Sequence, residues 1–527
     1  MGLWNYYFIT KLFLYLGNYI DFHVWVNLAF ATFLAIPIPK THVHSKRLSL
    51  SRQVIAVPAG IALLYYDTWL PPITRIFTQS SQLGGFSTTY LMELIGRFIN
   101  PMVVAGLVLL YVICFFVQKK FRLSSFVFLF MLMPLISTVQ PQLSSRAQLE
   151  NAAADTPSPV VTDASLTGQL NAFYSNEAAR AVSFMPPPKA DAPFDIIFLQ
   201  VCSLSWDDLE FAKQRDNPFL KRFDIVYTNF NSAASYSGPA AIRLLRGSCG
   251  QPSHKSLYEP AQAQCLTLDN LKMAGFDRQL LMNHDGRYGD FLNDVRERGG
   301  LNVTPFEVKG LPAYLQSFDG SPVHDDYEVL SKWWGKRLQL PTERVALYYN
   351  TVSLHDGNYY SSRNGDSRRP NSMEIYPRRL TRLLDDMDRF FSVLQASGRH
   401  AVVVLLAEHG ASVRGDKMQI AGMREIPTPL ISTVPVGIKL IGLPDQPDAK
   451  PVLVTKPTSY LAISQLLANF LTITPFGKSS LSMDDYVRDL PATEFVAQNE
   501  DVVVMLNGKQ YYILSKGASW VEYDASK

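Results

Sequence analysis

The sequence predicts an α/β chain: an N-terminal bundle of membrane-spanning helices, then a doubly wound α/β sandwich that ends in a β-hairpin element. Three observations predict this fold class. Long apolar stretches gather in residues 1–140 of the 527. After residue 193, apolar runs rich in β-branched residues alternate with helical patterns, as is typical of strands covered on both faces. The tail alternates around Asn507-Gly508, a strong hairpin signal.

The apolar N-terminal region contains candidate spans whose lengths approach the thickness of a bilayer core. They cover about residues 3–20, 22–38, 53–70, 101–118 and 124–140. Lys11 and Asn18 interrupt the first, so it either spans or lies in the membrane interface, and four or five spans are predicted. No small-residue cleavage site follows one short apolar core, so a removable signal peptide is not expected.

Basic residues in the short loops orient these spans. The loops 40–52 and 119–122 are rich in Lys and Arg, so both are expected in the cytoplasm. The segment 71–100 and everything after residue 140 then face the other side, and Asp67 is expected as a solvated residue at that interface. The net charge of +3 is too small to indicate nucleic-acid binding.

Residues 141–192 are rich in Ala, Ser, Pro and Thr and are predicted to form a flexible linker in which 165–183 can form an isolated amphipathic helix. The domain predicted for 193–527 has strands at 195–201, 279–283, 344–351, 402–407 and 436–441. Helices are predicted at 378–396 and 459–470, hairpin strands at 501–506 and 510–514, and a further strand at 520–523.

Two of the predicted strands end at residues that can bind a metal ion. The run DIIFLQV stops at Cys202, and the run AVVVLLA stops at Glu408-His409. In open α/β sheets the ligand site lies outside the carboxyl ends of the strands. Cys202, Glu408 and His409 are therefore expected to meet at one edge of one sheet, although they are far apart in the sequence.

A candidate nucleophile stands at the start of a predicted helix. Ser237 lies in Ser-Tyr-Ser-Gly-Pro, ahead of AAIRLLRG, and Pro239 suits the first helical turn. A hydroxyl there faces the free amides and the positive end of the helix dipole, which favour a phosphate group. A lone serine before a helix is also commonly just an N-cap, and that interpretation stays open.

Thiolate, imidazole and carboxylate ligands favour zinc over calcium or magnesium, and the Ser237 oxygen would complete a tetrahedral set. Zinc lowers the pKa of a bound hydroxyl, which would make Ser237 a nucleophile at neutral pH. Two plainer interpretations remain: Cys202 packs at a strand end, and Glu408-His409 is an ordinary exit from a strand. Adjacent side chains can bind one metal only if the strand has ended and the chain turns, as Gly410 permits.

These motifs resemble those of one family. The membrane segments, FDI-x5-CSLSW, NFNSA-x-SYSGPAAIRLLR-x-SCGQ, FDGSPV, LHDGN, EHG and the tail are similar to those of the cellulose phosphoethanolamine transferases of bacterial cellulose-secretion systems, over nearly the whole chain. More distantly, the chain resembles the alkaline-phosphatase-like superfamily, which includes sulfatases and lipid A phosphoethanolamine transferases. The lipid A branch has Thr where Ser237 stands. The sulfatase Arg is missing after Ser237, so maturation to formylglycine is not expected.

The resemblance implies an active site, a reaction and a location. The residues implied are Cys202, Ser237, Glu408 and His409 for the zinc, with Ser237 as covalent nucleophile, and Tyr236, His355 and Arg424 for the pocket. The reaction would move phosphoethanolamine from phosphatidylethanolamine to glucose 6-hydroxyls of nascent cellulose. The chain would be a multi-pass protein of the bacterial inner membrane, with a periplasmic catalytic domain beside subunits of the cellulose synthase complex.

The residues that line this pocket by resemblance have weaker support from their positions alone. His355 follows a predicted strand and can protonate a departing lipid oxygen or hold a phosphate oxygen. Arg424 either clamps a phosphate or forms a surface salt bridge. His284 also follows a strand and is interpreted as a loop residue.

The four cysteines predict one disulfide. Cys114 lies in a predicted span and Cys202 is expected at the metal, which leaves Cys249 and Cys265 in a polar loop. A bridge between them requires an oxidising compartment, in agreement with the predicted periplasmic position.

Two other functions are compatible with the sequence. A non-catalytic membrane scaffold could use a degenerate domain of this kind to organise polysaccharide export, and it would then lack stoichiometric zinc. A phosphodiesterase that hydrolyses its substrate is the nearest enzymatic rival. The membrane spans favour a lipid donor, and therefore a transferase, over the phosphodiesterase.

Overall fold

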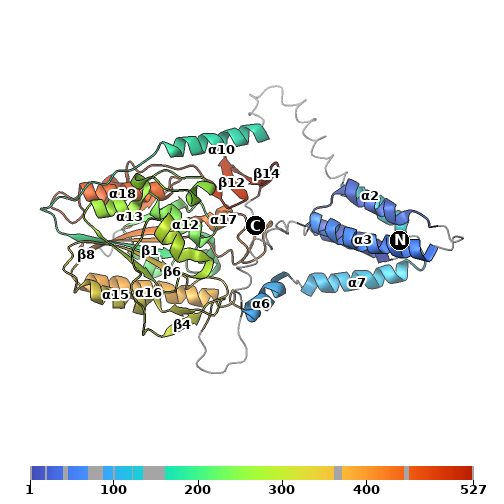
Figure 1. Cartoon of the computed structure of the whole chain (residues 1–527), viewed down its shortest axis with the longest axis horizontal. Coiled ribbons are helices and arrows are strands. Elements are labelled where there is room, and N and C mark those ends of the chain that lie inside the picture. Colours follow the sequence, from blue (N-terminus) through green and yellow to red (C-terminus); the bar gives the residue numbers. More distant parts are fainter. Residues whose placement is uncertain are drawn as a thin grey trace. The chain divides into compact units, whose positions relative to one another are not determined.

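The computed structural model describes residues 3–17, 20–38, 45–68, 87–98, 101–121, 123–134, 161–360, 371–443 and 450–524. Contacts within the chain divide it into two compact units. A helical unit comprises residues 1–79 and 95–160, and an α/β unit comprises residues 80–94 and 161–527. Figure 1 shows the helices of the first unit and the central sheet of the second.

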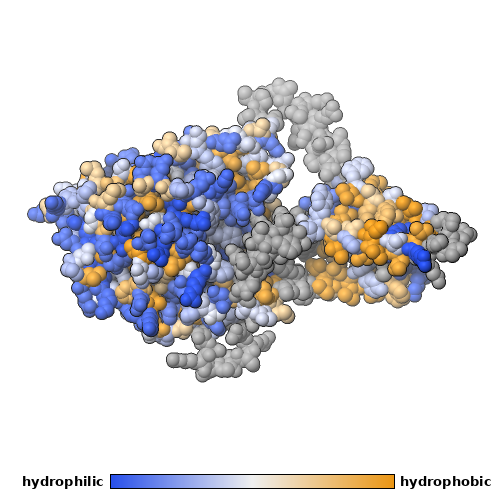
Figure 2. All heavy atoms as spheres, in the orientation of Figure 1, coloured by the Kyte–Doolittle hydropathy of each residue, from blue (hydrophilic) through white to orange (hydrophobic). Residues whose placement is uncertain are grey.

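The helical unit has apolar helices at the positions of the predicted spans. They are α1 (Leu3–Leu16), α2 (Val24–Ala35), α3 (Ser45–Tyr66), α7 (Pro101–Val117) and α8 (Leu123–Phe130). Within the part of the chain that the structure describes, one stretch, Arg47–Tyr66, is long and apolar enough to cross a membrane. Much of this unit's surface in Figure 2 is hydrophobic. The four or five predicted spans stay a prediction. Residues 18–19, 69–70 and 135–140, which belong to three of them and include Asn18, lie outside the described residues.

A buried polar cluster joins three segments of the helical unit. The Lys11 ammonium lies 2.5 Å from Asp67 Oδ2 and donates a hydrogen bond of 2.7 Å to Asn27 Oδ1. None of these three side chains is exposed. The expectation that Asp67 is solvated is wrong, because Lys11 of α1 and Asn27 of α2 reach it after α3 ends. Pairing of this kind is what allows a charge inside an apolar bundle.

In the described ranges, the central sheet of the α/β unit has seven strands in the order β10-β2-β9-β8-β1-β6-β3. Their bounds are β10 (Val452–Val454), β2 (Ile225–Asn231), β9 (Thr433–Ile441), β8 (His400–Ala407), β1 (Phe194–Val201), β6 (Val345–Thr351) and β3 (Asp277–Met282). The strands β8, β1, β6 and β3 are parallel, whereas β9 runs antiparallel to both of its neighbours. The sheet is therefore mixed. A buried strand is a continuous apolar run in either direction, so the sequence could not show this.

Helices cover both faces of the sheet (Figure 1), with α13 (Thr267–Met273) and α18 (Tyr460–Thr472) on one and α15 (Asp326–Arg337) and α16 (Tyr376–Ala396) on the other. The shorter helical elements are α11 (Trp206–Phe211), η1 (Pro218–Arg222), α12 (Ser237–Leu245), η2 (Lys255–Tyr258), η3 (Ala263–Cys265), η4 (Tyr288–Asp290), α14 (Phe291–Asn293), η5 (Asp294–Arg298), α17 (Pro429–Ser432) and α19 (Met483–Val487). The predicted strands and helices of this domain are confirmed, with small shifts at their ends. The sequence missed β2, whose face carries Thr and Asn, and the three-residue β10.

The tail forms an antiparallel sheet of β11 (Val496–Gln498), β12 (Val502–Asn507), β13 (Gln510–Ser515) and β14 (Trp520–Tyr523). The predicted hairpin is confirmed, and Gly508 in its turn has φ of 60°. A third small sheet contains β4 (Ala313–Gln316), β5 (Pro322–His324) and β7 (Tyr359–Tyr360).

The helix expected within the linker is present but is not isolated. It is α10 (Asp163–Ala178), capped by Thr162, and its Leu166, Leu170 and Phe173 pack against the C-terminal sheet. Burial of its apolar side thus fastens it to the α/β unit. Residues 141–160 of the predicted linker lie outside the described residues, and the division at residues 140 and 192 stays a prediction.

Candidate metal centre and nucleophile

The carboxyl ends of β1 and β8 bring Cys202 beside Glu408-His409. Val201 and Ala407 are partners in the parallel ladder, so the next residue of each strand leaves the sheet at the same edge. The His409 carbonyl accepts a 2.7 Å hydrogen bond from the amide of Leu204, which shows that the chain turns here across the end of β1. The strand has ended before Glu408, so the condition for two adjacent ligands is met.

Glycine is needed at the next position of this turn. A Cβ added to Gly410 would lie 2.7 Å from Ser205 Oγ and 3.0 Å from Asp208 Oδ2. The Asp208 carboxylate also accepts a 2.7 Å hydrogen bond from the amide of Ala411 and one of 2.9 Å from the amide of Ser205. One buried carboxylate therefore ties the loop after β1 to the loop after β8.

The side chains of Cys202, Ser237 and His409 converge. Ser237 Oγ lies 3.3 Å from Cys202 Sγ and 3.4 Å from His409 Nε2, and the sulfur lies 3.9 Å from the same nitrogen. The Glu408 Oε2 atom is 3.9 Å from His409 Nε2, and the donor atoms of Cys202, Glu408 and His409 all lie within 4.8 Å of one another. These are the ligand types and the clustering that a tetrahedral metal ion requires.

Ser237 is not the N-cap of its helix. The N-cap of α12 is Tyr236, whose side chain makes no capping hydrogen bond, and Ser237 is the first helical residue. Its hydroxyl instead faces the sulfur of Cys202 and the imidazole of His409. The simple capping interpretation of this serine therefore does not account for its position.

Backbone contacts orient the imidazole of His409. Its Nδ1 lies 2.9 Å from the Gly410 carbonyl, closer than the 3.5 Å to Arg424 Nη1. We therefore place the ring proton on Nδ1, donated to the carbonyl, which leaves the Nε2 lone pair facing the sulfur and the hydroxyl. A histidine whose second nitrogen donates to a carbonyl is the usual arrangement for a metal ligand.

A chain of hydrogen bonds supports Glu408 from behind. Asn350 Nδ2 donates to Glu408 Oε1 at 2.6 Å, and Asn350 Oδ1 accepts from His284 Nε2 at 2.9 Å. His284 Nδ1 in turn accepts from the amide of Gly286 at 3.2 Å, which fixes its tautomer. The loop residue His284 thus acts through Asn350 on a candidate ligand, a role that no local sequence pattern signals.

Burial shifts the pKa of each ionisable donor toward its uncharged form. It raises the pKa of Cys202 to about 12, an effect that Glu408 increases and Arg424 opposes. It also raises the pKa of Glu408 and lowers that of His409 well below its usual value. A thiolate and a carboxylate in so closed a space need positive charge beside them, and a divalent cation would supply it.

The second carboxylate oxygen of Glu408 also fits a metal ion. Oε2 is buried and makes no hydrogen bond of normal geometry with the described residues, although Ser237 and Cys202 are near enough to lower the pKa of the carboxyl. An orphaned, buried acceptor is expensive unless it has a partner. The donor set and this oxygen together suit zinc, with Cys202, Glu408, His409 and Ser237 as the residues that would hold it.

Arg424 and Tyr236 lie next to this cluster. Arg424 Nη1 donates to Ser203 Oγ at 3.1 Å, and its guanidinium carbon is 5.6 Å from the centre of the Tyr236 ring. The Tyr236 hydroxyl donates to Glu425 Oε1 at 2.7 Å. Arg424 is 8% exposed, so it is not a surface salt-bridge residue, and its charge acts on the buried donors of the cluster.

His355 lies at the same sheet edge, in the loop after β6. Its Nδ1 donates to the Asp356 carbonyl at 2.7 Å, and its ring centre is 4.7 Å from that of Phe318. Burial, followed by the charge of Arg424, lowers its pKa to about 4. The ring is therefore neutral near pH 7 and offers Nε2 as an acceptor. His355 and Arg424 both lie close enough to His409 for their charges to lower its pKa.

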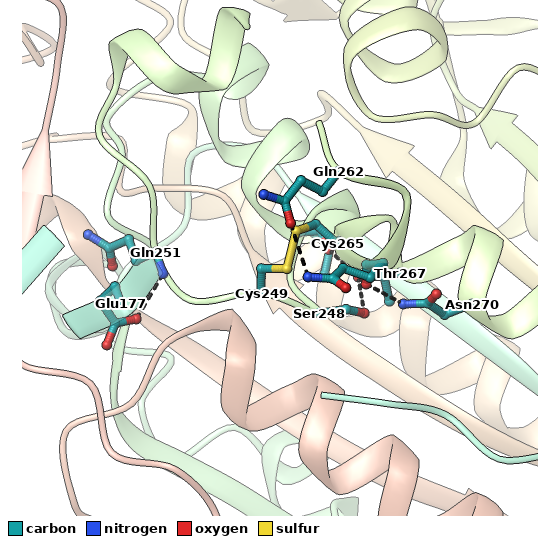
Figure 3. Close-up of a disulfide and its surroundings, with 10 residues drawn as sticks. Glu177, Ser248, Cys249, Gln251, Gln262, Cys265, Thr267 and Asn270 are labelled. Carbon is teal, nitrogen blue, oxygen red and sulfur yellow. Dashed lines mark hydrogen bonds between the residues drawn. A yellow bond between two sulfur atoms is a disulfide. The ribbon is translucent and has the colours of Figure 1, made fainter. Parts of the chain in front are cut away.

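The structure also joins Cys249 and Cys265 in the disulfide that the sequence predicts, while Cys114 and Cys202 are free. The bridge closes the loop after α12 (Figure 3). In the same region the amide of Gln251 donates to Glu177 Oε2 of α10 at 2.8 Å, and the amide of Val182 donates to the Ser248 carbonyl at 2.8 Å. The loop that carries the disulfide thus fastens the segment after α10 to the α/β unit.

We expect Cys249 and Cys265 to be linked in protein taken from the cell envelope without reductant. Replacing Cys249 by Ser should lower the free energy of unfolding by about 3 kcal/mol, because the bridge restricts a loop of this size in the unfolded chain. Peptide mapping of unreduced protein checks the link, and chemical denaturation checks the stability. Two thiols that alkylate freely would contradict the pairing.

The comparisons with known proteins agree with each other. The chain matches the family described as "Cellulose biosynthesis protein BcsG" in both parts, the N-terminal domain over residues 4–136 and the C-terminal domain over residues 150–520. The BcsG protein of Escherichia coli strain K12 is 40% identical over 548 residues, which cover 99% of this chain and 96% of the relative. The BcsG protein of Salmonella typhimurium strain LT2 is 39% identical over 547 residues, with the same shares.

Solved structures are similar at a greater distance. A protein in the alkaline phosphatase superfamily from Vibrio parahaemolyticus is 15% identical with a TM-score of 0.45, covering 68% of this chain and 88% of its own. The lipooligosaccharide phosphoethanolamine transferase A of Neisseria meningitidis is 13% identical with a TM-score of 0.42, covering 92% and 98%. These distant likenesses assign no activity to the chain.

The alignments with the E. coli and Salmonella relatives cover almost the full length of this chain and of each relative. The two family matches cover the helical region and the α/β region. The chain therefore belongs to the BcsG family of cellulose biosynthesis proteins.

Proposed function

We propose that this chain is a zinc-dependent transferase that moves phosphoethanolamine from phosphatidylethanolamine to glucose 6-hydroxyls of nascent cellulose. The observation that carries the proposal is the convergence of Cys202, Glu408 and His409 on the hydroxyl of Ser237 at the start of α12. Membership of a family of cellulose biosynthesis proteins supports the acceptor. The family resemblance of the motifs supports the group that is transferred.

Ser237 acts as the nucleophile in a two-step transfer. Its Oγ, which has already lost its proton to solvent, attacks the donor phosphorus, an Oγ–P bond forms, and the bond from phosphorus to the glycerol oxygen breaks to release diacylglycerol. A sugar hydroxyl then attacks the same phosphorus, and the Oγ–P bond breaks, which returns Oγ to the deprotonated form in which it began. A bound zinc ion would lower the pKa of the serine hydroxyl and offset the charge of the phosphoryl group. The free amides at the start of α12 favour the same anionic group.

His355 moves the protons of both steps. Its ring is neutral at rest, and the negative charge of a bound phosphodiester favours the protonated form. The protonated ring gives its proton to the departing glycerol oxygen, and the neutral ring then takes the proton of the attacking sugar hydroxyl. One proton is given and one is recovered in each cycle, so the ring returns to the protonated form that the bound donor favours.

Arg424 and Tyr236 hold the phosphoryl group from the side. Arg424 is buried beside His409, and the planar fork of a guanidinium suits two phosphate oxygens. Tyr236 directly precedes the nucleophile, and its hydroxyl is held by Glu425. The two residues therefore orient the donor rather than react with it.

Analysis of the secreted polysaccharide tests the proposal. Cells with the wild-type chain should secrete cellulose that carries phosphoethanolamine in solid-state NMR spectra, and cells with the Ser237→Ala chain should secrete unmodified cellulose. Unmodified cellulose from both, together with release of free phosphoethanolamine, would favour a hydrolysing phosphodiesterase. Absence of stoichiometric zinc with normal polysaccharide export would favour a non-catalytic scaffold.

The proposal places the α/β unit in the periplasm of the bacterial inner membrane, beside the cellulose synthase complex. The basic loops 40–52 and 119–122 support cytoplasmic ends for the neighbouring helices, and Arg47–Tyr66 is long enough to span. The donor lipid and the emerging polymer would then meet on the same side of the membrane.

Reporter fusions check this orientation. An alkaline-phosphatase reporter fused after Ala154 should be active, because that position follows the last predicted span, and one fused after Lys46 should be silent. The reverse pattern would place the α/β unit in the cytoplasm and would remove the case for an exported acceptor.

A further inference from the structure

The segment between α3 and α7 contributes a helix to the α/β unit. This helix, α6 (Thr88–Phe98), has its first turns in the unit formed by residues 80–94 and 161–527. The sequence predicts that 71–100 faces away from the cytoplasm. The structure shows that its described part makes specific hydrogen bonds with loops of the α/β unit.

Two side chains of α6 reach the loop that carries His355. The Tyr90 hydroxyl donates to Asp356 Oδ2 at 2.9 Å. Glu93 accepts a hydrogen bond of 2.9 Å from the Ser372 hydroxyl and another from the hydroxyl of Tyr359. Both ends of the loop after β6 are therefore tied to α6.

Asp356 links this contact to His355. Its backbone carbonyl accepts the Nδ1 proton of His355 at 2.7 Å, so the position of the Asp356 peptide sets the ring orientation and the tautomer. Its carboxylate, which is 5% exposed, accepts from the Tyr90 hydroxyl, from the Ser372 hydroxyl at 2.6 Å and from the amide of Gly357 at 2.8 Å. Tyr90 is thus one of the donors that hold this carboxylate.

Close packing reinforces the hydrogen bonds. A Cβ added to Gly357 would lie 2.8 Å from the Tyr90 ring and 2.6 Å from Phe318 Cβ, and Gly357 has φ of 78°. The Tyr90 ring also lies 5.9 Å from the Phe318 ring, which in turn lies 4.7 Å from the His355 ring. Tyr90 therefore packs directly against the backbone next to His355, where a larger residue than glycine would not fit.

Charge balance gives Glu93 a second role. Arg379 of α16 is buried and donates to the carbonyls of His355 at 2.7 Å and Ser353 at 3.0 Å. Burial lowers the pKa of Arg379, and Asp356 and Glu93 both act in the opposite direction. The negative charge of Glu93 thus acts favourably on the buried cation that fixes the His355 peptide.

We propose that Tyr90 and Glu93 are positioning residues that hold His355 in the geometry for proton transfer. This inference rests on the proton-transfer role proposed for His355. It means that a segment next to the predicted membrane span completes the reaction site of the α/β unit.

The test compares two donors with the full-length chain. Phosphatidylethanolamine has a poor leaving group that needs a proton, whereas an aryl phosphoethanolamine releases an aryl oxide that needs none. Release of the leaving group in the first turnover reports the first step alone. The variants are Tyr90→Phe, which removes only a hydroxyl, and Glu93→Gln, which removes only a charge. The control is Met92→Ala, on the same helix but 65% exposed.

Tyr90→Phe and Glu93→Gln should each slow diacylglycerol release about 10-fold or more, part of the roughly 10²–10⁴-fold that a positioned acid contributes. Aryl release and zinc content should not change, the variants should stay folded in thermal unfolding, and Met92→Ala should behave as wild type. In a His355→Gln background, Tyr90→Phe should cause no further loss.

Equal losses with the two donors, or a loss that adds to that of His355→Gln, would overturn the positioning role. A Ser237→Ala chain that releases the aryl group at the wild-type rate would instead overturn the proposed function itself, and this outcome is distinct from the others.

Discussion

Replacing Ser237 by Ala is expected to reduce transfer by at least about 10⁴-fold, as loss of the nucleophile does in other enzymes with covalent intermediates. The stability of the fold should change little. Loss of an N-cap side chain lowers the free energy of unfolding by about 0.5–2 kcal/mol. The Ser237 hydroxyl caps no helix, so its removal should not have this cost. Turnover with a lipid donor and thermal unfolding of the purified chain measure the two effects separately.

The matched control is Ser237→Thr, which keeps a hydroxyl at the same atom position. This variant should retain part of the activity, because the reacting oxygen is still present. The added methyl group should only displace that oxygen from its position in the wild-type chain. Near wild-type turnover by a folded Ser237→Ala chain would show that another residue is the nucleophile.

Replacing Cys202 by Ala is expected to remove most of the bound zinc. The sulfur is one of three clustered donors, all from residues with no exposed surface. Loss of a residue that only hydrogen-bonds to a ligand lowers metal affinity roughly 10–100-fold. Loss of a direct ligand should lower the zinc affinity by more than this. Inductively coupled plasma mass spectrometry of the purified full-length chain gives the metal content.

Cys114→Ala is the control for this substitution, since that thiol lies in α7 of the helical unit and is also buried. It should leave the zinc content unchanged. Equal zinc in the two variants would exclude the Cys202 thiolate as a ligand.

The sequence predicted the sheet edge well because its signals are local. The runs that became β1 and β8 are continuously apolar, and each stops at a polar residue. The rule that ligands gather at the carboxyl ends of parallel strands then places Cys202 beside Glu408-His409 without any knowledge of contacts. The same local logic located the hairpin at Asn507-Gly508.

Residues that support the site through long-range contacts could not be found in this way. Asn350 lies inside β6 as one polar residue in a buried strand, and its amide group reaches Glu408 only because β6 and β8 flank β1. Tyr90 reaches Asp356 across 266 residues of sequence. The buried pair of Lys11 and Asp67 was missed for the same reason. A single charged residue predicts a solvent-exposed position unless its partner is known.

Isolation of the covalent intermediate tests the central claim most directly. The purified full-length chain is mixed with phosphatidylethanolamine in the absence of an acceptor, quenched in acid and digested, and the peptide that contains Ser237 is analysed by tandem mass spectrometry. We predict one phosphoethanolamine group on Ser237, absent from the Ser237→Ala and Cys202→Ala chains. An unmodified Ser237 during active turnover, or a modification on a different residue, would contradict the account.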